Sequence, residues 1–536
     1  MGRGAALPRV AALDGLRGAA VACVLLFHGG HLIGGYLGVD LFFVLSGFLI
    51  TSLLLAESTT TGRIGLGGFW ARRARRLLPA IGGLMVGVAI YAVVFADPAE
   101  LAQIRGDALA TVFYFANWRA VFATQDYWAL FQAPSPLQHT WSLAIEEQFY
   151  LVWPLVFVGL LVWWKRAAAQ AVSVTAVTLA GSSGLLMVVL YDPANTNRAY
   201  YGADSRAAAV LLGAALAAAL VVWGPVRGRF GRIALEVAGL GGVVVLAAAW
   251  MRLGGQAPRL YRGGFFLVGV AAIAVIAAAA HPQAGVVSRV LSFRPLCLVG
   301  LISYGVYLWH WPVYVVVDAE RVGFTGWPLL GVRVAITFVI AIVSYVLIEQ
   351  PIRHGALSAR SWKVLTPALA TGVVMLIIGT TLGATPAPPA AGEVVGPVTF
   401  AVREAKARPD ATRVTIVGNS VGDSIAEGMK EMKADPPVVV HDAAVIACAF
   451  PSGATASRHS EDSAPDELAP FSCDDRWQDA PAKRDRPDAR RPRDRSVRVG
   501  VSRWHMPPER TRCRAPAGSC AFRGRECPLG CRLDAR

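Results

Sequence analysis

The amino-acid sequence predicts an all-α polytopic membrane protein of about eleven transmembrane helices, followed by a partial α/β module and a disordered tail. The first observation is composition, because 55% of the 536 residues are hydrophobic, only 16% are charged and the mean hydropathy is +0.48. These values are typical of membrane proteins. The second observation is the number of long apolar runs, and the third is a change of composition after residue 384.

Eleven apolar runs are each long enough to cross a hydrocarbon layer of about 30 Å. They fall near residues 17–35, 37–56, 77–96, 145–164, 171–191, 207–223, 233–251, 264–281, 296–318, 328–348 and 364–384. The loop at 97–144 contains LATVFYFANWRAVFA, which is interpreted as an interfacial amphipathic helix. Counting it as a further span would move the Lys- and Arg-rich loops that follow to the opposite side of the membrane.

Lys and Arg favour cytoplasmic loops, and most of them fall on one side of the predicted spans. Those on the N-terminal side are Arg3, Arg9, the 63–76 cluster, Lys165, Arg166, Arg227, Arg229, Arg232, Arg289, Arg294, Arg353, Arg360 and Lys363. The main exceptions are Arg252, Arg259 and Arg262. We therefore expect a cytoplasmic N-terminus, and an odd number of spans then puts the C-terminal region outside the cytoplasm.

Composition changes again beyond the last predicted span. Residues 385–410 are a Pro-rich linker. Residues 411–479 carry two β-branched runs, and a Gly-containing turn and a helix-like pattern follow the first, which indicates a partial α/β module. Residues 480–536 lack aliphatic periodicity and are predicted to be disordered. From Lys483 onward sixteen Lys and Arg oppose six Asp and Glu, so this tail supplies +10 of the net charge of +15 and does not argue for nucleic-acid binding.

Two ionisable residues lie on one stripe of the first predicted helix, in LDGLRGAAVACVLLFHGGH. Arg17 and His28 are eleven residues apart, which is almost three helical turns and roughly 16 Å along the axis. If Arg17 marks the cytoplasmic edge, His28 lies near the middle of the membrane, where an ionisable side chain is costly and marks a functional site. The alternative is that His28 only bonds a neighbouring helix and Arg17 is an ordinary boundary charge.

Further polar motifs at helix edges give the chain a resemblance to a known family. They are LDGLRG with a His eleven residues past the Arg, GVDLFFVLSGFLI, FWARRARRLLPA, HTWSLAIEEQFYLVWP, SYGVYLWHWP and EQPIR. Residues 1–362 resemble the integral-membrane acyltransferase family 3, of the O-antigen and peptidoglycan O-acetylase type. Residues 363–384 would be an additional helix. The module at 411–479 resembles the SGNH hydrolases often fused to such enzymes.

The resemblance implies a membrane O-acyltransferase in the bacterial inner or plasma membrane. It implies transfer of an acyl group, expected to be acetyl, from cytosolic acyl-CoA to a hydroxyl of an extracytoplasmic cell-surface glycan. The expected partners are therefore acyl-CoA, a cell-envelope glycan and the lipid bilayer. Acyl-CoA is a co-substrate, and no metal is expected.

The residue types match this chemistry, which needs a base, charge stabilisation for the oxyanion and cations for the phosphates of the donor. His28 is expected to be the base, with Arg17 beside the reaction and either Asp14 or Asp40 orienting the imidazole ring. Both aspartates have an alternative as cap or ion-pair residues at helix edges.

Arg73 and Arg76 lie three residues apart at the predicted cytoplasmic border, where guanidinium groups suit phosphate oxygens. Their alternative is ordinary anchoring at the membrane surface. Glu146 and Glu147 begin the next span, and Glu147 is expected among the catalytic residues because it occupies the characteristic glutamate position of the family. Loop or substrate contacts, or structural hydrogen bonds, are expected for His139, Asp204, Arg206 and His310.

In the C-terminal module, Ser420 follows the strand VTIV within Gly-Asn-Ser, where the resembling hydrolases carry a Gly-Asp-Ser nucleophile turn. Ser420 is therefore the expected nucleophile, although Gly422-Asp423-Ser424 has the usual letters four residues later. No Asp-x-x-His occurs near the C-terminus. We therefore interpret residues 480–536 as a non-native reading frame or degenerate tail and the serine module as truncated.

Two other classes of function fit parts of the pattern. A glycan or lipid transporter would also place polar residues within the membrane. A membrane-anchored exported serine esterase would use Ser420 and leave the helices passive.

Overall fold

The computed structural model describes residues 9–122, 135–193, 195–353 and 359–383, and five short strands between residues 412 and 501. Two compact units are present, Met1–Ala387 and Pro388–Arg536, so the division falls in the predicted linker.

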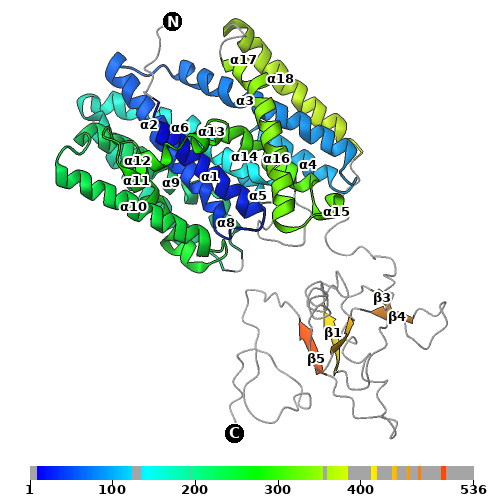
Figure 1. The fold of residues 1–536 in the computed structure, drawn as a ribbon. Helices are drawn as coiled ribbons and strands as arrows, with labels where there is room; N and C mark the ends of the chain where they lie inside the picture. Colours follow the sequence, from blue (N-terminus) through cyan, green and yellow to red (C-terminus); the bar gives the residue numbers. More distant parts are fainter. Residues whose placement is uncertain are drawn as a thin grey trace, which may run out of the picture. The chain divides into compact units, whose positions relative to one another are not determined.

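The described part of the first unit contains helices and connecting turns (Figure 1). Its α-helices are α1 (Ala11–His28), α2 (Gly38–Thr61), α3 (Leu66–Val94), α4 (Leu101–Val112), α5 (Ala116–Phe122), α6 (Trp141–Trp164), α7 (Ala168–Leu190), α8 (Asn197–Tyr201), α9 (Ala203–Trp223), α10 (Arg229–Arg252), α11 (Phe265–Ala279), α12 (Val286–Leu291), α13 (Arg294–Leu301), α14 (Ser303–Val316), α15 (Ala319–Val322), α16 (Gly326–Ser344), α17 (Gln350–Arg353) and α18 (Ala359–Thr380). Short 3-10 or π turns lie at Gly35–Leu37, Gln138–Thr140, Lys165–Ala167, Leu260–Gly264 and Tyr345–Glu349.

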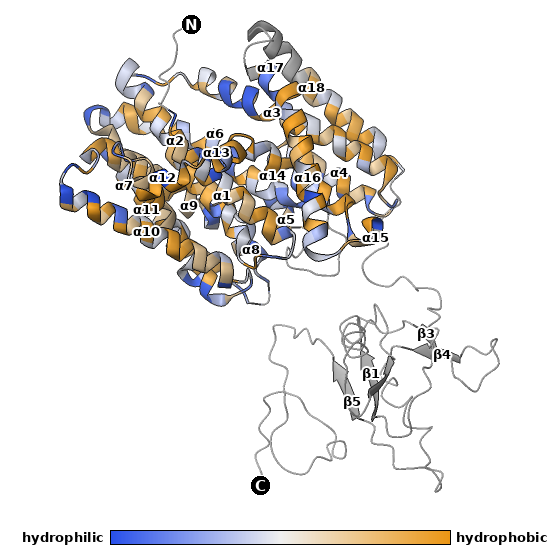
Figure 2. Cartoon of the chain, viewed as in Figure 1, coloured by the Kyte–Doolittle hydropathy of each residue, from blue (hydrophilic) through white to orange (hydrophobic). Residues whose placement is uncertain are grey.

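Length and hydropathy identify this unit as a multi-pass membrane protein. Within the described residues, eight helical segments are long and apolar enough to cross a membrane, or nine if α13 and α14, which meet at 71°, form one broken span. Hydrophobic residues cover most of the helical unit, and hydrophilic residues gather at helix ends (Figure 2). Each of the eleven predicted runs lies on a helix or a helix pair. The number of eleven crossings remains a prediction, because one of the eight segments contains both α6 and α7 and α18 does not count among them.

Two helix boundaries differ from the expectation. The first helix spans Ala11–His28 rather than 17–35, because Gly29 and Gly30, the latter at a φ of +78°, follow it and turn the chain back. The predicted interfacial helix is divided into α4 and α5, and Tyr114 between them has a φ of +58°. Hydropathy does not report such local breaks.

The crossing of α1 with α13 determines where the N-terminal motif lies. A Cβ atom on Gly18 would overlap the carbonyl oxygen of Leu296, and one on Gly300 would overlap the carbonyl oxygen of Asp14. The two backbones therefore touch, as small residues allow between membrane helices. Because α14 continues directly from α13, this contact also brings α14 beside α1.

The second unit contains a parallel sheet in the order β2-β1-β5, made of β1 (Thr412–Gly418), β2 (Val438–Asp442) and β5 (Val497–Val501). A separate antiparallel pair joins β3 (Thr455–Arg458) to β4 (Ala469–Ser472). Parallel neighbours are typical of α/β folds. Strand β5 lies in the range expected to be disordered, where SVRVGV is a local exception with alternating valines. Ser420 lies outside the described residues.

Replacing Gly300 with Leu is expected to separate α1 from α13. The added side chain has no space against the carbonyl of Asp14, and overpacking of this kind costs about 1–3 kcal/mol. Thermal unfolding of the detergent-solubilised protein should therefore shift to a lower temperature. The matched control is Gly159→Leu in α6, where an added Cβ meets no atom within 4 Å. Equal melting temperatures for the two variants would contradict the close crossing.

Candidate functional site

Residues from five helices enclose a polar cavity of about 70 Å³, which we call the arginine cavity. Its lining consists of Arg17 from α1, Val39, Phe42 and Ser46 from α2, Arg73, Arg76 and Leu77 from α3, Ser142, Leu143, Glu146 and Tyr150 from α6, and Ser303, Tyr304 and Tyr307 from α14. Three guanidinium groups thus share one small space with a single carboxylate. Like charges gathered in this way favour an anionic ligand.

Glu146 is held in place on one wall of the arginine cavity. The hydroxyl of Ser46 donates to Oε1 of Glu146 at 3.1 Å, and the hydroxyl of Tyr150 lies 3.2 Å from Oε2 and 2.9 Å from Oγ of Ser46. Trp70 in turn donates from Nε1 to the backbone carbonyl of Tyr150 at 3.0 Å. This network fixes α6 against α2 and α3 at the level of the cavity.

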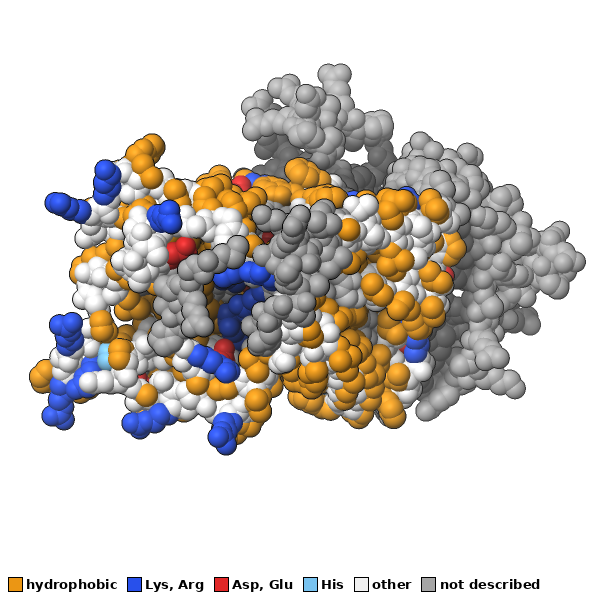
Figure 3. All heavy atoms as spheres, turned by 90° about the horizontal axis from the view of Figure 1, so that it is seen from above, with side chains coloured by type: hydrophobic (Ala, Val, Ile, Leu, Met, Phe, Trp, Pro, Cys, Tyr) orange, Lys and Arg blue, Asp and Glu red, His pale blue; other side chains and the backbone are white. Residues whose placement is uncertain are grey.

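The arginines reach the cavity from helix ends. Arg73 lies over the ring of Tyr150, with its guanidinium carbon 4.7 Å from the ring centroid, in a cation–π contact. Arg17 lies 3.7 Å from Asp14, which also pairs with Arg9 at 2.6 Å. Figure 3 views the end of the bundle at which α1 begins, where Lys and Arg side chains gather around a hollow near the middle of the face.

A second polar group, the histidine cluster, consists of His28, His139 and His310. Nδ1 of His28 and Nε2 of His310 are 3.1 Å apart. Nδ1 of His310 lies 2.5 Å from the carbonyl oxygen of Tyr307, and Nε2 of His139 lies 3.1 Å from the carbonyl oxygen of Leu308. His139 and His310 are buried and His28 is half-buried.

Tyr307 belongs to both groups of residues. Its hydroxyl lines the arginine cavity, 2.6 Å from Oγ of Ser142, and donates to the carbonyl of His139 at 3.1 Å. Its ring lies 5.3 Å from that of His310, and its own carbonyl contacts the same histidine. Tyr307 and Ser142 therefore stand between the arginine cavity and the histidine cluster.

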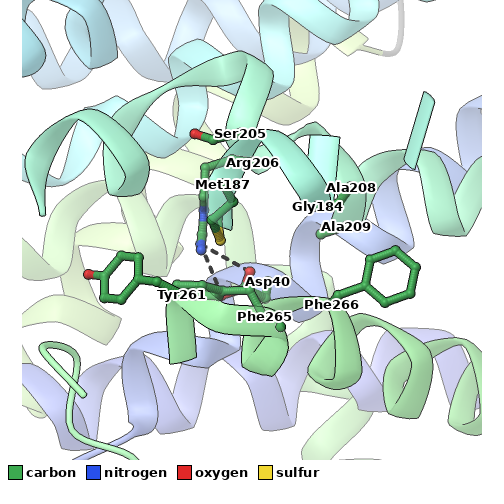
Figure 4. Close-up of a pocket in the computed structure, with 11 residues that line it drawn as sticks. Asp40, Gly184, Met187, Ser205, Arg206, Ala208, Ala209, Tyr261, Phe265 and Phe266 are labelled. Carbon is green, nitrogen blue, oxygen red and sulfur yellow. Dashed lines mark hydrogen bonds and ion pairs between the residues drawn. The ribbon is translucent and has the colours of Figure 1, made fainter. Parts of the chain in front are cut away.

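A third buried polar group is the ion pair of Asp40 and Arg206, which joins α2 to α9 (Figure 4). Nη2 of Arg206 lies 3.0 Å from each carboxylate oxygen, and both side chains are at most 2% exposed. The guanidinium is enclosed by the rings of Phe43, Trp141, Tyr200 and Phe265. The adjoining cavity is only about 10 Å³, so this pair has space for no more than a water molecule.

The structure gathers several predicted residues but separates others. Arg17, Arg73 and Arg76 line one cavity, whereas His28 lies at the opposite end of α1. Neither Asp14 nor Asp40 orients His28. Asp14 lies fourteen residues earlier on the same helix, about 21 Å along its axis, and Asp40 pairs with Arg206.

Among the other predicted residues, Asp204 pairs with Arg198 at 2.6 Å. Glu147 is half-buried but outside the cavity lining, which contains its neighbour Glu146 instead.

Helix α14 contributes more polar residues to the site than the sequence analysis indicates. Ser303, Tyr307 and His310 recur at i, i+4 and i+7, so they form one polar stripe on an otherwise apolar helix. Applied to SYGVYLWHWP, this spacing was the signal that could have placed His310 beside a functional site. Within the described residues, no group of three or more His, Cys, Asp or Glu has a geometry suited to a metal ion, and this includes the histidine cluster.

Breaking the buried ion pair from one side is expected to destabilise the helical unit. Asp40→Leu leaves the Arg206 charge buried without a counter-ion, which costs about 3–5 kcal/mol. The double variant Asp40→Leu/Arg206→Met removes both charges and should regain most of this loss. Thermal unfolding in detergent measures both variants. A double variant no more stable than Asp40→Leu would show that the pair stabilises the helical unit by more than mutual neutralisation of the two charges.

The chain matches the acyltransferase domain family over residues 10–349. It is 40% identical over 354 residues to the peptidoglycan O-acetyltransferase OatA of Listeria monocytogenes, covering 64% of this chain and 56% of the relative. It is 38% identical over 356 residues to the O-acetyltransferase OatA of Staphylococcus aureus, covering 65% and 58%. It is 39% identical over 352 residues to the putative peptidoglycan O-acetyltransferase YrhL of Bacillus subtilis, covering 64% and 54%.

The matches thus span little more than half the length of these relatives. No solved structure matches the chain. The family match covers most of the chain and includes the residues of the arginine cavity and the histidine cluster. The chain therefore belongs to the acyltransferase 3 family.

Proposed function

We propose that this protein transfers an acetyl group from cytosolic acetyl-CoA toward a hydroxyl of peptidoglycan or a similar cell-wall glycan. The observation that carries the proposal is the arginine cavity, in which three guanidinium groups from α1 and α3 face one space. The names of the relatives indicate an acetyl group and a glycan acceptor. The donor site and the base are argued from the arginine cavity and the histidine cluster.

The arginine cavity fits the phosphate groups of a coenzyme A thioester. Guanidinium groups bind phosphate oxygens through paired hydrogen bonds, and such charge-assisted bonds are stronger inside a protein than in water. Glu146 is the one carboxylate of the cavity lining, while Asp14 pairs with Arg17 and Glu147 interacts electrostatically with Arg73 and Arg76 from outside the lining. An anionic donor would meet the guanidinium groups on the side that faces the cavity.

The histidine cluster supplies the second requirement, a base for the acceptor hydroxyl. His28 lies about 16 Å along α1 from Arg17. Coenzyme A carries its thioester on a long, narrow arm. A donor whose phosphates bind at the arginines can therefore place its acyl group at a separate site along α1. The reaction joins the hydroxyl oxygen to the acyl carbon, breaks the carbon–sulfur bond and moves the hydroxyl proton through the imidazole to the leaving thiolate.

The topology that we propose has the arginine-rich end of the bundle at the cytoplasm and the C-terminal region outside. In that arrangement the donor approaches at the arginine cavity and the acceptor at the far end of α1. In an intact relative the exported serine module would take part in the last transfer, with Ser420 as its nucleophile. Residues 480–536 contain no Asp-x-x-His, so the proposal for this chain ends at transfer of the acetyl group toward the glycan.

Removing one arginine is expected to weaken binding of acetyl-CoA through its phosphates. Arg73→Ala should raise the KM for acetyl-CoA about ten- to hundredfold, because a hydrogen bond to a charged group contributes about 1.5–3 kcal/mol. The same variant assayed with S-acetyl-pantetheine, which lacks the nucleotide and its diphosphate, should show no comparable loss relative to the wild type. Release of free thiol from purified protein in lipid measures both. An equal loss with both donors would contradict phosphate binding at Arg73.

Replacing the proposed base is expected to slow the reaction without weakening donor binding. His28→Ala should lower kcat for thiol release about 10²- to 10⁴-fold with little change in the KM for acetyl-CoA. Undiminished thiol release in His28→Ala would exclude this route, and a wild type that releases no thiol would favour a transporter. An activity that survives His28→Ala and Arg73→Ala but is lost in Ser420→Ala would favour the membrane-anchored esterase.

A further inference from the structure

The contact between His28 and His310 joins two imidazole rings from helices far apart in the sequence. Nδ1 of His28 and Nε2 of His310 are 3.1 Å apart, and the ring centroids are 5.0 Å apart. In a hydrogen bond between two ring nitrogens, one carries the hydrogen and the other must present a lone pair. The direction of this bond therefore decides the protonation pattern of both rings.

The backbone of α14 sets that direction. Nδ1 of His310 lies 2.5 Å from the carbonyl oxygen of Tyr307, and a carbonyl can only accept, so this nitrogen carries the hydrogen. In the neutral ring Nε2 of His310 then has the lone pair. It accepts a hydrogen from Nδ1 of His28, which leaves the lone pair of His28 on Nε2.

Two further neighbours contact the His28 ring. The carbonyl of Val24, one turn earlier on α1, also forms a hydrogen bond with the His28 ring. The ring centroid of Trp311 lies 4.6 Å from that of His28. Nε1 of Trp311 donates to the carbonyl of Ser135 at 2.9 Å, and this bond holds the indole ring beside the imidazole.

The third histidine of the cluster has a different role in the network. Nε2 of His139 donates to the carbonyl of Leu308 at 3.1 Å, and Nδ1 of His139 is buried without a hydrogen-bond partner. Its ring packs edge-on against His310 at 5.3 Å. Like His310, His139 is buried and bonds to the backbone of α14. Among the contacts of the described residues, it forms no hydrogen bond with His28.

We propose that His310 is a positioning residue that holds His28 in the Nδ1–H tautomer, so that Nε2 of His28 is the nitrogen that accepts the proton of the acceptor hydroxyl. A histidine anchored to the carbonyl of Tyr307 takes the place in which many enzymes use a carboxylate. The chemical part of this proposal rests on the proposed function, whereas the tautomer of His28 does not. When His28 has taken the proton, Nδ1–H still donates to His310, and the proton leaves from Nε2 to the thiolate.

The tautomer is measured directly in the full-length protein. The chain has nine histidines, so uniform ¹³C,¹⁵N-histidine labelling in lipid bilayers gives few signals for solid-state NMR, and His28→Gln assigns the signal of His28 by subtraction. His28 is expected as the Nδ1–H form in the wild type and in His139→Gln. In His310→Ala it should shift to a mixture or to the Nε2–H form. An Nε2–H signal in the wild type, or an unchanged His28 signal in His310→Ala, would overturn the proposal.

Kinetics test the consequence for the reaction. His310→Ala is expected to lower kcat for thiol release at least tenfold and to leave the KM for acetyl-CoA within about twofold, because His310 lies outside the arginine cavity. His310→Gln should regain a substantial part of kcat, since its amide oxygen can accept the Nδ1–H of His28. The control is His281→Gln, in the exposed loop after α11, which should match the wild type.

The outcomes separate the two proposals. A rise in KM for His310→Ala, or equal kcat for the Ala and Gln variants, would contradict positioning of His28. If the wild type releases no thiol with any acceptor while His28 still shows the Nδ1–H signal that depends on His310, the proposed function fails and the tautomer assignment stands.

Discussion

The close crossing of α1 with α13 is the constraint on which the proposed chemistry depends. Gly18 and Gly300 bring the two backbones into contact, and α14, which follows α13 after a bend of 71°, is thereby placed along α1. One end of α1 then contributes Arg17 to the arginine cavity, and the other end places His28 against His310. A polar side chain in an apolar bundle needs such fixed partners, because an unsatisfied polar group there is costly.

The polar residues of the bundle divide into a structural group and a functional group. Asp40 and Arg206 neutralise each other within an aromatic enclosure that has no space for a ligand, and they connect α2 to α9. The arginine cavity differs, because its lining places three cations and one carboxylate around an open space. Burial alone does not distinguish these groups. The balance of charge and the presence of a cavity do.

Much of the helical unit follows from the sequence, because a run of apolar residues both predicts a helix and places it in the membrane. Arg17, Arg73 and Arg76 were also predictable, since motif and charge coincide there. The partner of His28 was not predicted, although the helical rise alone separates Asp14 from His28 and the stripe Ser303, Tyr307 and His310 was present in the sequence. Which glutamate of the pair at 146 and 147 faces the cavity depends on the rotation of α6, which hydropathy does not determine.

The most direct test of the account is a structure of the full-length protein in a lipid bilayer with a non-hydrolysable thioether analogue of acetyl-CoA. The account predicts phosphate density within hydrogen-bond distance of Arg17, Arg73 and Arg76, and the analogue's acyl carbon beside Nε2 of His28, with Tyr307 moved or rotated to admit the arm. Analogue density elsewhere, or an acyl group remote from His28 while the phosphates occupy the arginine cavity, would contradict it.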